Sequence, residues 1–224
     1  MSKNPDAMRA NPLGYIIPAS ETEEGRERER AYYEALGRFV DMFAKVESTV
    51  AQTLWAYANV TPATAKIIFA GTRMDGACGY IKQIAEASNA AGDARNDLAD
   101  VLQQATIING ARNAILHYGA TSIAEGEAIV SDALKAKGEP TEIPISPTAL
   151  NNMTADCRKI VVHLGYRHLK RPPPLGQFGR NVLNSVLRAP WQYKHPVPKK
   201  LSTRQQESQP RTGRGPKPPP PLGS

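Results

Sequence analysis

The chain has 224 residues, of which 41% are hydrophobic and 22% are charged, and its formal net charge is +7. This length suits one well-buried domain with extensions, and no window is apolar enough to span a membrane or to act as the core of a signal peptide. The composition argues against an integral membrane protein, and we expect a soluble protein of the cytoplasm.

The first long helix is predicted close to the N-terminus. Residues 1–25 have no apolar periodicity, and we expect a flexible segment there. From residue 27 to about residue 59, apolar residues recur at alternating steps of three and four, which predicts a helix with one face toward a bundle core. Glu47 falls within this stripe, where an acid needs a partner, although the neighbouring Val46 can fill the core instead. The apolar members of the stripe are Leu36, Val40, Phe43, Val50, Leu54 and Tyr57.

Two shorter helices are predicted next. Thr61 and Pro62 are a favourable N-cap and first-turn pair for a helix that ends at Gly71. A third helix covers about residues 74–87, and its expected core residues are Tyr80, Ile81 and Ile84.

A second long helix and a final helix complete the predicted body. Asp93 is the expected N-cap of the long helix, and Gly119 is a natural C-terminal stop. Residues 121–145 then break the helical period and indicate a small hairpin and a further extended piece. The Ser146-Pro147 pair begins the final helix, which carries the last apolar stripe before a run of prolines.

The domain organisation follows from these elements and from the distribution of charge. Residues 26–170 are predicted to form an all-α bundle of four to five helices, with two long helices and a small β-hairpin-like insertion before the last helix. Residues 171–224 contain ten Lys or Arg residues against one acid, so the remaining chain has a balance of −2. We expect this Pro-rich basic segment to be a disordered tail, in which residues 177–188 have the spacing of a short amphipathic helix.

No metal or cofactor is expected from the sequence. Cys78 and Cys157 have no Cys or His nearby at the spacing of zinc ligands, and we expect buried, reduced thiols. His163 and His168 on the final helix are expected to be surface or core residues and not metal ligands.

The strongest chemical signal is Arg112, Asn113 and His117, near the end of the second long helix. A permanent cation beside a group that titrates near neutrality is what RNA cleavage requires. On a regular helix, Arg112 and His117 point about 140° apart. Arg112 continues the apolar stripe, so its stem should lie against the bundle, and we hypothesise that Glu47 on the facing helix orients it. His117 lies on a small, polar face with Gly110, which suits close approach of a second subunit or an RNA strand.

This R-N-x-x-x-H signature, late in a long helix of a small all-α bundle, resembles the HEPN superfamily of ribonucleases and toxins. The resemblance implies a homodimer in which two copies of the motif face each other across a cleft and cut RNA without a metal ion. It implies that Arg112 and His117 form the catalytic pair and that Asn113 is their polar companion. In the branch of toxins paired with a nucleotidyltransferase antitoxin, one residue separates the histidine from a tyrosine. Here Tyr118 follows His117 directly, and Gly119 holds the tyrosine position.

The predicted function is a metal-independent endoribonuclease, with a toxin or defence effector as one role. His117 would be the general acid or base, and Arg112 would stabilise the phosphate transition state. The expected partners are RNA and a second copy of the chain, and an antitoxin or another protein is a further candidate. Two alternatives stay open: a catalytically inactive bundle of the same fold that dimerises or binds nucleic acid, and a structural interaction protein in which the motif is coincidental.

Overall fold

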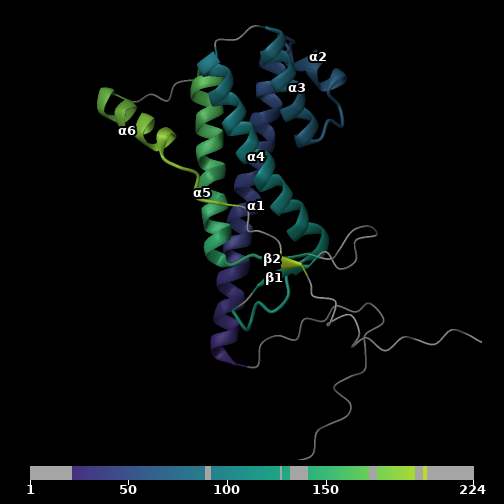
Figure 1. The fold of residues 1–224 in the computed structure, drawn as a ribbon, viewed down its shortest axis with the longest axis vertical. Helices are drawn as coiled ribbons and strands as arrows, with labels where there is room; N and C mark the ends of the chain where they lie inside the picture. The colour runs from purple at the N-terminus through teal and green to yellow at the C-terminus, as the bar shows by residue number, and fades with distance from the viewer. Residues whose placement is uncertain are drawn as a thin grey trace, which may run out of the picture.

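A computed structural model describes residues 22–88, 92–126, 128–131, 141–171, 176–194 and 199–200. These residues form six α-helices, one π-helical turn and three short strands (Figure 1). In chain order, the elements are α1 (Glu23–Tyr57), α2 (Pro62–Ile68), α3 (Met74–Ala87), α4 (Gly92–Tyr118), β1 (Ile129–Ser131), β2 (Thr141–Pro144), α5 (Pro147–His163), the π-helical turn η2 (Leu164–His168), α6 (Gln177–Arg188) and β3 (Lys199–Lys200).

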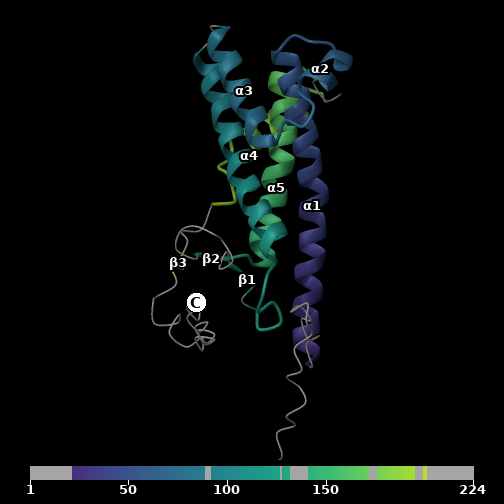
Figure 2. The ribbon, with the colours of Figure 1, turned by 90° about the vertical axis from the view of Figure 1, so that its right-hand side faces the viewer.

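Three long helices, α1, α4 and α5, form the body of the molecule. They run along its long axis and pack side by side, and α3 packs against α1 and α4 at one end (Figures 1 and 2). The short α2 lies at that same end. The described residues are therefore mostly helical, which confirms the prediction of an all-α fold. No helix among the described residues is both long enough and apolar enough to cross a membrane.

The buried stripe of α1 includes Phe43, Val50 and Leu54, as predicted, but not Val40. Phe39 and Val46 are completely buried, whereas Val40 is 40% exposed and Glu47 is also exposed. Steps of three and four residues through Phe39 and Val46 keep one face toward α5 and α3, and the next residue along the helix is rotated about 100° from that face. The prediction for Val40 is thus wrong, and Val46 occupies the core beside the exposed Glu47.

Local signals at the helix ends behave as predicted. The hydroxyls of Thr61 and Ser146 accept hydrogen bonds from the backbone N–H three residues later, at 3.3 and 3.1 Å, at the starts of α2 and α5. Gly119 has a φ of +68°, and its N–H donates to the carbonyl of Ile115 at 2.9 Å, which ends α4.

Two expectations for α3 and α4 need correction. Tyr80 is 48% exposed, while the core position of α3 is filled by the fully buried Ile81. Asp93 does not cap α4, because the helix already begins at Gly92 and places Asp93 in its first turn. There, its carboxylate lies near the positive end of the helix dipole.

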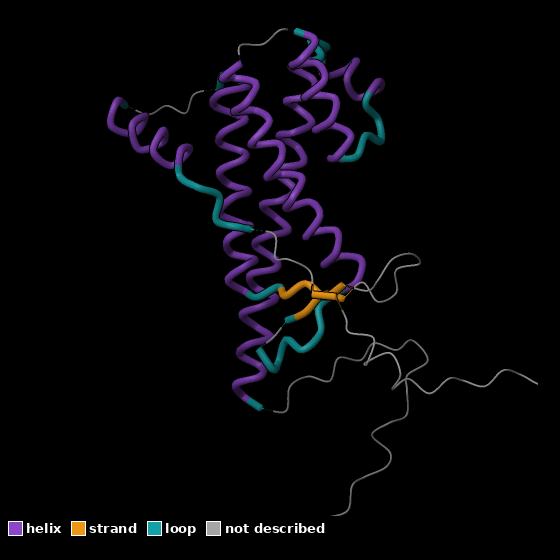
Figure 3. Tube along the Cα trace, viewed as in Figure 1, coloured by secondary structure: helices purple, strands orange, loops and turns teal. Residues whose placement is uncertain are grey.

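The insertion before α5 contributes β1 and β2 to a small antiparallel sheet near the C-terminal end of α4, and β3, from beyond α6, pairs with β2 as the third strand (Figure 3). Thr121 and Ile129 exchange backbone hydrogen bonds of 2.9 and 3.0 Å across a turn at Gly126. Strands β1 and β2 therefore lie where the helical period breaks, between residues 121 and 145.

Packed structure continues past the predicted boundary at residue 170. Helix α6 covers the residues where the sequence indicates a short helix, and Tyr193 beyond it is only 4% exposed. The backbone N–H groups of Gln192 and Tyr193 donate to Asp156 on α5, at 3.0 and 2.8 Å. The predicted flexibility of residues 1–21 and the predicted disorder of residues 172–175, 195–198 and 201–224 lie outside the described residues.

Candidate functional site

A cleft of about 540 Å³ opens beside the R-N-x-x-x-H motif. Its walls come from the middle of α1, the start of α3 and the last turns of α4. The cleft, called the motif cleft below, is bordered by all four residues that the sequence singles out: Glu47, Arg112, Asn113 and His117. These residues therefore meet at one concave surface of a single chain.

The guanidinium of Arg112 is held from two sides. Its Nη1 donates to Oδ1 of Asn113 at 2.9 Å, and its carbon lies 5.5 Å from the ring centre of Phe43 on α1. The side chain is half-buried, so its stem lies against the bundle as helical phase predicts. Contact with an aromatic face stabilises the cation and leaves donors in the guanidinium plane free for an anion.

Glu47 does not pair directly with Arg112. Both border the motif cleft, but among the described residues neither forms an ion pair. The physical reason is the phase of α1: Val46 fills the core, Glu47 points to the edge of the cleft, and Arg112 lies over Phe43, one turn earlier. Glu47 and Arg112 thus border the same cleft, as the hypothesis that Glu47 orients Arg112 requires, but the two side chains are not in contact.

His117 is exposed in the last turn of α4. Its ring lies edge-on to that of Tyr118, with 6.5 Å between the ring centres. On the same polar face, a Cβ added at Gly110 would meet no atom within 4 Å. The imidazole can therefore be approached from solvent along this face of α4.

The start of α3 adds groups that the sequence reading missed. Arg73 and the first residues of α3 border the motif cleft, so the positive end of this helix dipole faces it. Asn109, which is 5% exposed, donates its amide to Oδ1 of Asp75 at 2.9 Å and so ties α4 to the first turn of α3. In the sequence, the position of Asn109 at the motif cleft is indicated only by its spacing of four residues from Asn113, which puts both on one face of α4.

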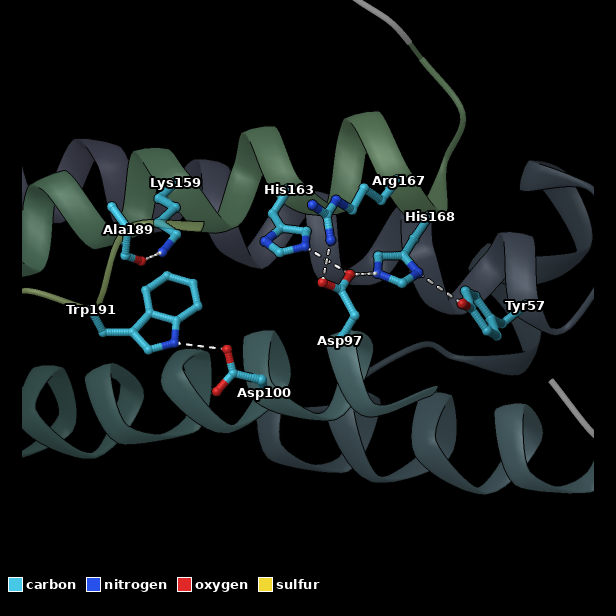
Figure 4. Close-up of polar contacts among 9 residues, drawn as sticks. All are labelled: Tyr57, Asp97, Asp100, Lys159, His163, Arg167, His168, Ala189 and Trp191. Carbon is cyan, nitrogen blue, oxygen red and sulfur yellow. Dashed lines mark hydrogen bonds and ion pairs between the residues drawn. The ribbon is translucent and has the colours of Figure 1, made fainter. Parts of the chain in front are cut away.

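A second polar cluster lies around Asp97, near the start of α4 (Figure 4). Oδ2 of Asp97 lies 2.8 Å from Nε2 of His163 and 3.2 Å from Nε2 of His168. Oδ1 accepts from Nη1 of Arg167 at 2.5 Å, and the hydroxyl of Tyr57 lies 3.0 Å from Nδ1 of His168. These five residues, called the Asp97 cluster below, come from α1, α4, the end of α5 and η2.

The π-helical turn η2 brings the two imidazoles together. Residues five apart on an α-helix point about 140° away from each other. In η2 the backbone N–H of Leu169 instead donates to the carbonyl of Leu164, five residues back, at 2.8 Å. His163 and His168 therefore stack, with ring centres 6.2 Å apart and planes inclined by 19°. Both were expected to be surface or core residues, and both prove to be buried members of one cluster.

Burial decides the charge state of the Asp97 cluster. It lowers the pKa of His163 and of His168 below the usual value, although the hydrogen bonds to Asp97 offset part of this effect. Burial alone would raise the pKa of Asp97, but the hydrogen bond from His163 and the charge of Arg167 outweigh it, and the pKa is lowered. At neutral pH, the cluster is a carboxylate between two neutral imidazoles.

The Asp97 cluster borders a pocket of about 580 Å³ that is open to solvent. Tyr57, Asp97, Arg167 and His168 lie in its wall, whereas His163 lies behind them. Within the part of the chain that the structure describes, Nδ1 of His163 is buried and has no hydrogen-bond partner.

Comparisons of the chain with protein-family models, with curated proteins and with solved structures find no match.

The two sites suit different chemistry. The motif cleft combines an exposed imidazole with a half-buried guanidinium. In the Asp97 cluster, two almost fully buried imidazoles converge on a single carboxylate oxygen.

Proposed function

We propose that the protein is a metal-independent endoribonuclease of the HEPN type that cleaves RNA in the motif cleft. The observation that carries this proposal is that Arg112 and His117 border one cleft although they point to different sides of α4. A phosphodiester bound there can contact both side chains at once. Arg73 and the N-terminal end of α3 lie on the opposite wall, beside the carboxylate of Asp75, and offer the RNA backbone a further cation and helix N–H groups.

His117 supplies the proton transfer in this proposal. Its imidazole takes the proton of a ribose 2′-hydroxyl, and the oxygen attacks the adjacent phosphorus. The bond from phosphorus to the 5′-oxygen breaks, and this oxygen takes a proton from the His117 of a second subunit or from water. The products are a 2′,3′-cyclic phosphate and a free 5′-hydroxyl.

Arg112 stabilises the charge that develops on the phosphate. Its planar fork of donors matches the phosphate oxygens, and a guanidinium keeps its charge throughout the reaction. Asn113 and Phe43 already hold the group on the wall of the cleft, so little reorganisation is needed when negative charge builds up. Asn113 is thus a positioning residue.

A homodimer fits the surroundings of the motif. Leu116 and Tyr118, on either side of His117, are 50% and 37% exposed. Exposed apolar side chains next to a polar site favour contact with another protein surface. We propose that a second copy of the chain covers them and brings two His117 side chains together. A toxin or defence role, with an antitoxin as one further partner, belongs to the same proposal.

Incubation of the full-length protein with total RNA in EDTA tests the activity. We expect cleavage to products that end in cyclic phosphate, and a rate lower by about 100-fold or more in both Arg112→Ala and His117→Ala. Arg95→Ala, at an exposed position near the other end of α4, and His195→Ala, outside the described residues, are the matched controls and should cleave normally. Circular dichroism checks that every variant is folded.

Intact RNA after incubation with folded wild-type protein would refute the enzyme and leave the second candidate, an inactive HEPN-like module for dimerisation or RNA binding. The exposed Leu116 and Tyr118 favour that candidate over a monomeric structural protein. Cleavage that persists in both motif variants would instead refute Arg112 and His117 as the catalytic pair.

A further inference from the structure

We propose that the Asp97 cluster binds a divalent transition-metal ion, of which Zn²⁺ fits best, through Oδ2 of Asp97 and Nε2 of His163 and His168. The site is independent of the proposed RNA cleavage, because Asp97 precedes Arg112 by about 22 Å along α4 at the usual rise of a helix. The proposal departs from the expectation, based on sequence, that these histidines bind no metal.

The positions of the three donor atoms suit one ion. All lie within 4.8 Å of one another, and the two Nε2 atoms are 2.8 and 3.2 Å from Oδ2. Zinc binds histidine nitrogen and carboxylate oxygen at about 2.0–2.2 Å, so neighbouring ligands of a tetrahedral site are separated by roughly 3.4 Å. Small shifts of the side chains therefore admit an ion in place of the two Nε2 protons that the imidazoles now direct at Asp97.

The types of donor also favour a transition metal. Two imidazole nitrogens with one carboxylate are a common ligand set for zinc and for non-haem iron, whereas Mg²⁺ and Ca²⁺ prefer oxygen ligands throughout. The buried imidazoles are neutral and the carboxylate is ionised, which are the forms that coordinate a metal.

Neighbouring groups hold two of the ligands in place. The hydroxyl of Tyr57 lies 3.0 Å from Nδ1 of His168, the nitrogen that would not face the ion. Arg167 binds Oδ1 of Asp97 and leaves Oδ2 to the imidazoles. Such outer partners orient ligands in many metal sites.

The turn η2 is a second, independent observation. Single π-helical turns inside helices are rare and occur frequently at functional sites. Here the turn places both imidazoles on the same carboxylate oxygen. A simple hydrogen-bonded link between α4 and α5 would need only one histidine. A ligand role explains why two imidazoles converge.

An ion also has a route to the cluster. The pocket of about 580 Å³ reaches Asp97 and His168, so water can fill a remaining coordination position. The geometry therefore fits an exchangeable site with an open position more closely than a closed structural site.

Zinc titration of the full-length protein tests the proposal. Protein without a histidine tag is stripped with EDTA, dialysed and titrated with ZnCl₂ in a calorimeter, and its zinc content is measured after dialysis. We expect one ion per chain, an affinity at least tenfold lower in Asp97→Asn and in His168→Gln, and an affinity about tenfold lower in Tyr57→Phe. His117→Gln, which removes an imidazole outside the cluster, should bind zinc like the wild type.

Cobalt provides a second measurement that needs no variant. Co²⁺ bound to wild-type protein should give the visible absorption of a four- or five-coordinate ion without the charge-transfer bands of thiolate ligands. The absence of stoichiometric zinc and cobalt binding by wild-type protein would overturn the proposal, as would unchanged affinity in both Asp97→Asn and His168→Gln. RNA is absent from both assays, so their outcome is separate from that of the cleavage experiment.

Discussion

At the scale of single residues, neighbours on α1 have opposite roles. Val46 is completely buried between the helices, and Glu47 is exposed at the edge of the motif cleft. A rotation of about 100° per residue separates them, so one residue contributes packing and the next only charge.

Substitution at these two positions should separate their contributions to stability. Val46→Ala removes two buried carbon atoms and leaves a cavity, so we expect the free energy of unfolding to fall by about 2–3 kcal/mol. Glu47→Gln should change it by less than about 0.5 kcal/mol, because the side chain is exposed. Urea unfolding followed by circular dichroism measures both. A large loss in Glu47→Gln would mean that Glu47 has a partner in the folded protein.

At the scale of elements, one spacing has two outcomes. Arg112 and His117 are five residues apart on the regular helix α4, and they border one cleft although they point to different sides of the helix. His163 and His168 are also five apart, but the wider turn η2 stacks their rings. The helix type, and not the spacing, decides which side chains meet.

The link between α4 and η2 should weaken in acid when no metal is present. In the unfolded chain, His163 and His168 titrate near 6.5, whereas the folded state holds both pKa values lower. Below about pH 6.5, the unfolded state therefore binds more protons than the folded state, and the free energy of unfolding decreases as the pH is lowered. The lowered pKa of Asp97 adds a further loss below about pH 4, because its usual value is 3.8.

Urea unfolding in EDTA between pH 7.5 and pH 5 measures this dependence. We expect a smaller slope in His168→Gln, which removes one of the two titrating imidazoles. Equal slopes in wild type and variant would contradict the prediction.

At the scale of the whole molecule, the segment after α6 is part of the folded body. The carboxylate of Asp156 accepts from the backbone of Gln192 and Tyr193, and the amide of Gln104 donates both to Asp156 and to the carbonyl of Tyr193, at 3.0 and 2.9 Å. Nε1 of Trp191 donates to Asp100 on α4 at 3.0 Å (Figure 4). The segment thus bridges α4 and α5.

Lys159 strengthens this bridge from α5. Its ammonium donates to the carbonyl of Ala189 and lies 4.0 Å from the ring centre of Trp191 (Figure 4). The same contacts explain why the proline-rich composition misplaces the end of the domain: two aromatic residues, Trp191 and Tyr193, are enough to anchor the chain once Asp156 satisfies the backbone.

Truncation should locate the end of the folded body. A chain that stops after Arg188 loses buried Tyr193 and the donors to Asp156, so we expect it to be less stable by on the order of 3 kcal/mol or more. A chain that stops after Lys200 keeps these contacts and should match the full-length protein. Thermal unfolding compares the three proteins, and equal stability of the two truncated chains would contradict the anchoring.

Much of the fold could be predicted because its signals are local. The cap at Ser146, the stop at Gly119 and the bounds of α3 depend on residues three or four apart, whose hydrogen bonds form within one turn. The all-α class follows from apolar periodicity in the same way, and the motif at Arg112 and His117 can be read directly from the chain.

The sequence by itself therefore determined the helices and the residues of the motif, and the tertiary structure decided which side chains share a site. The phase of α1 against its neighbours separated Glu47 from Arg112, and the turn η2 joined His163 and His168 to Asp97. Contacts between residues far apart in the chain depend on how the helices pack and on where a helix widens into a π-helical turn. A shift of one residue along a helix rotates the side chain that faces a neighbour by about 100°.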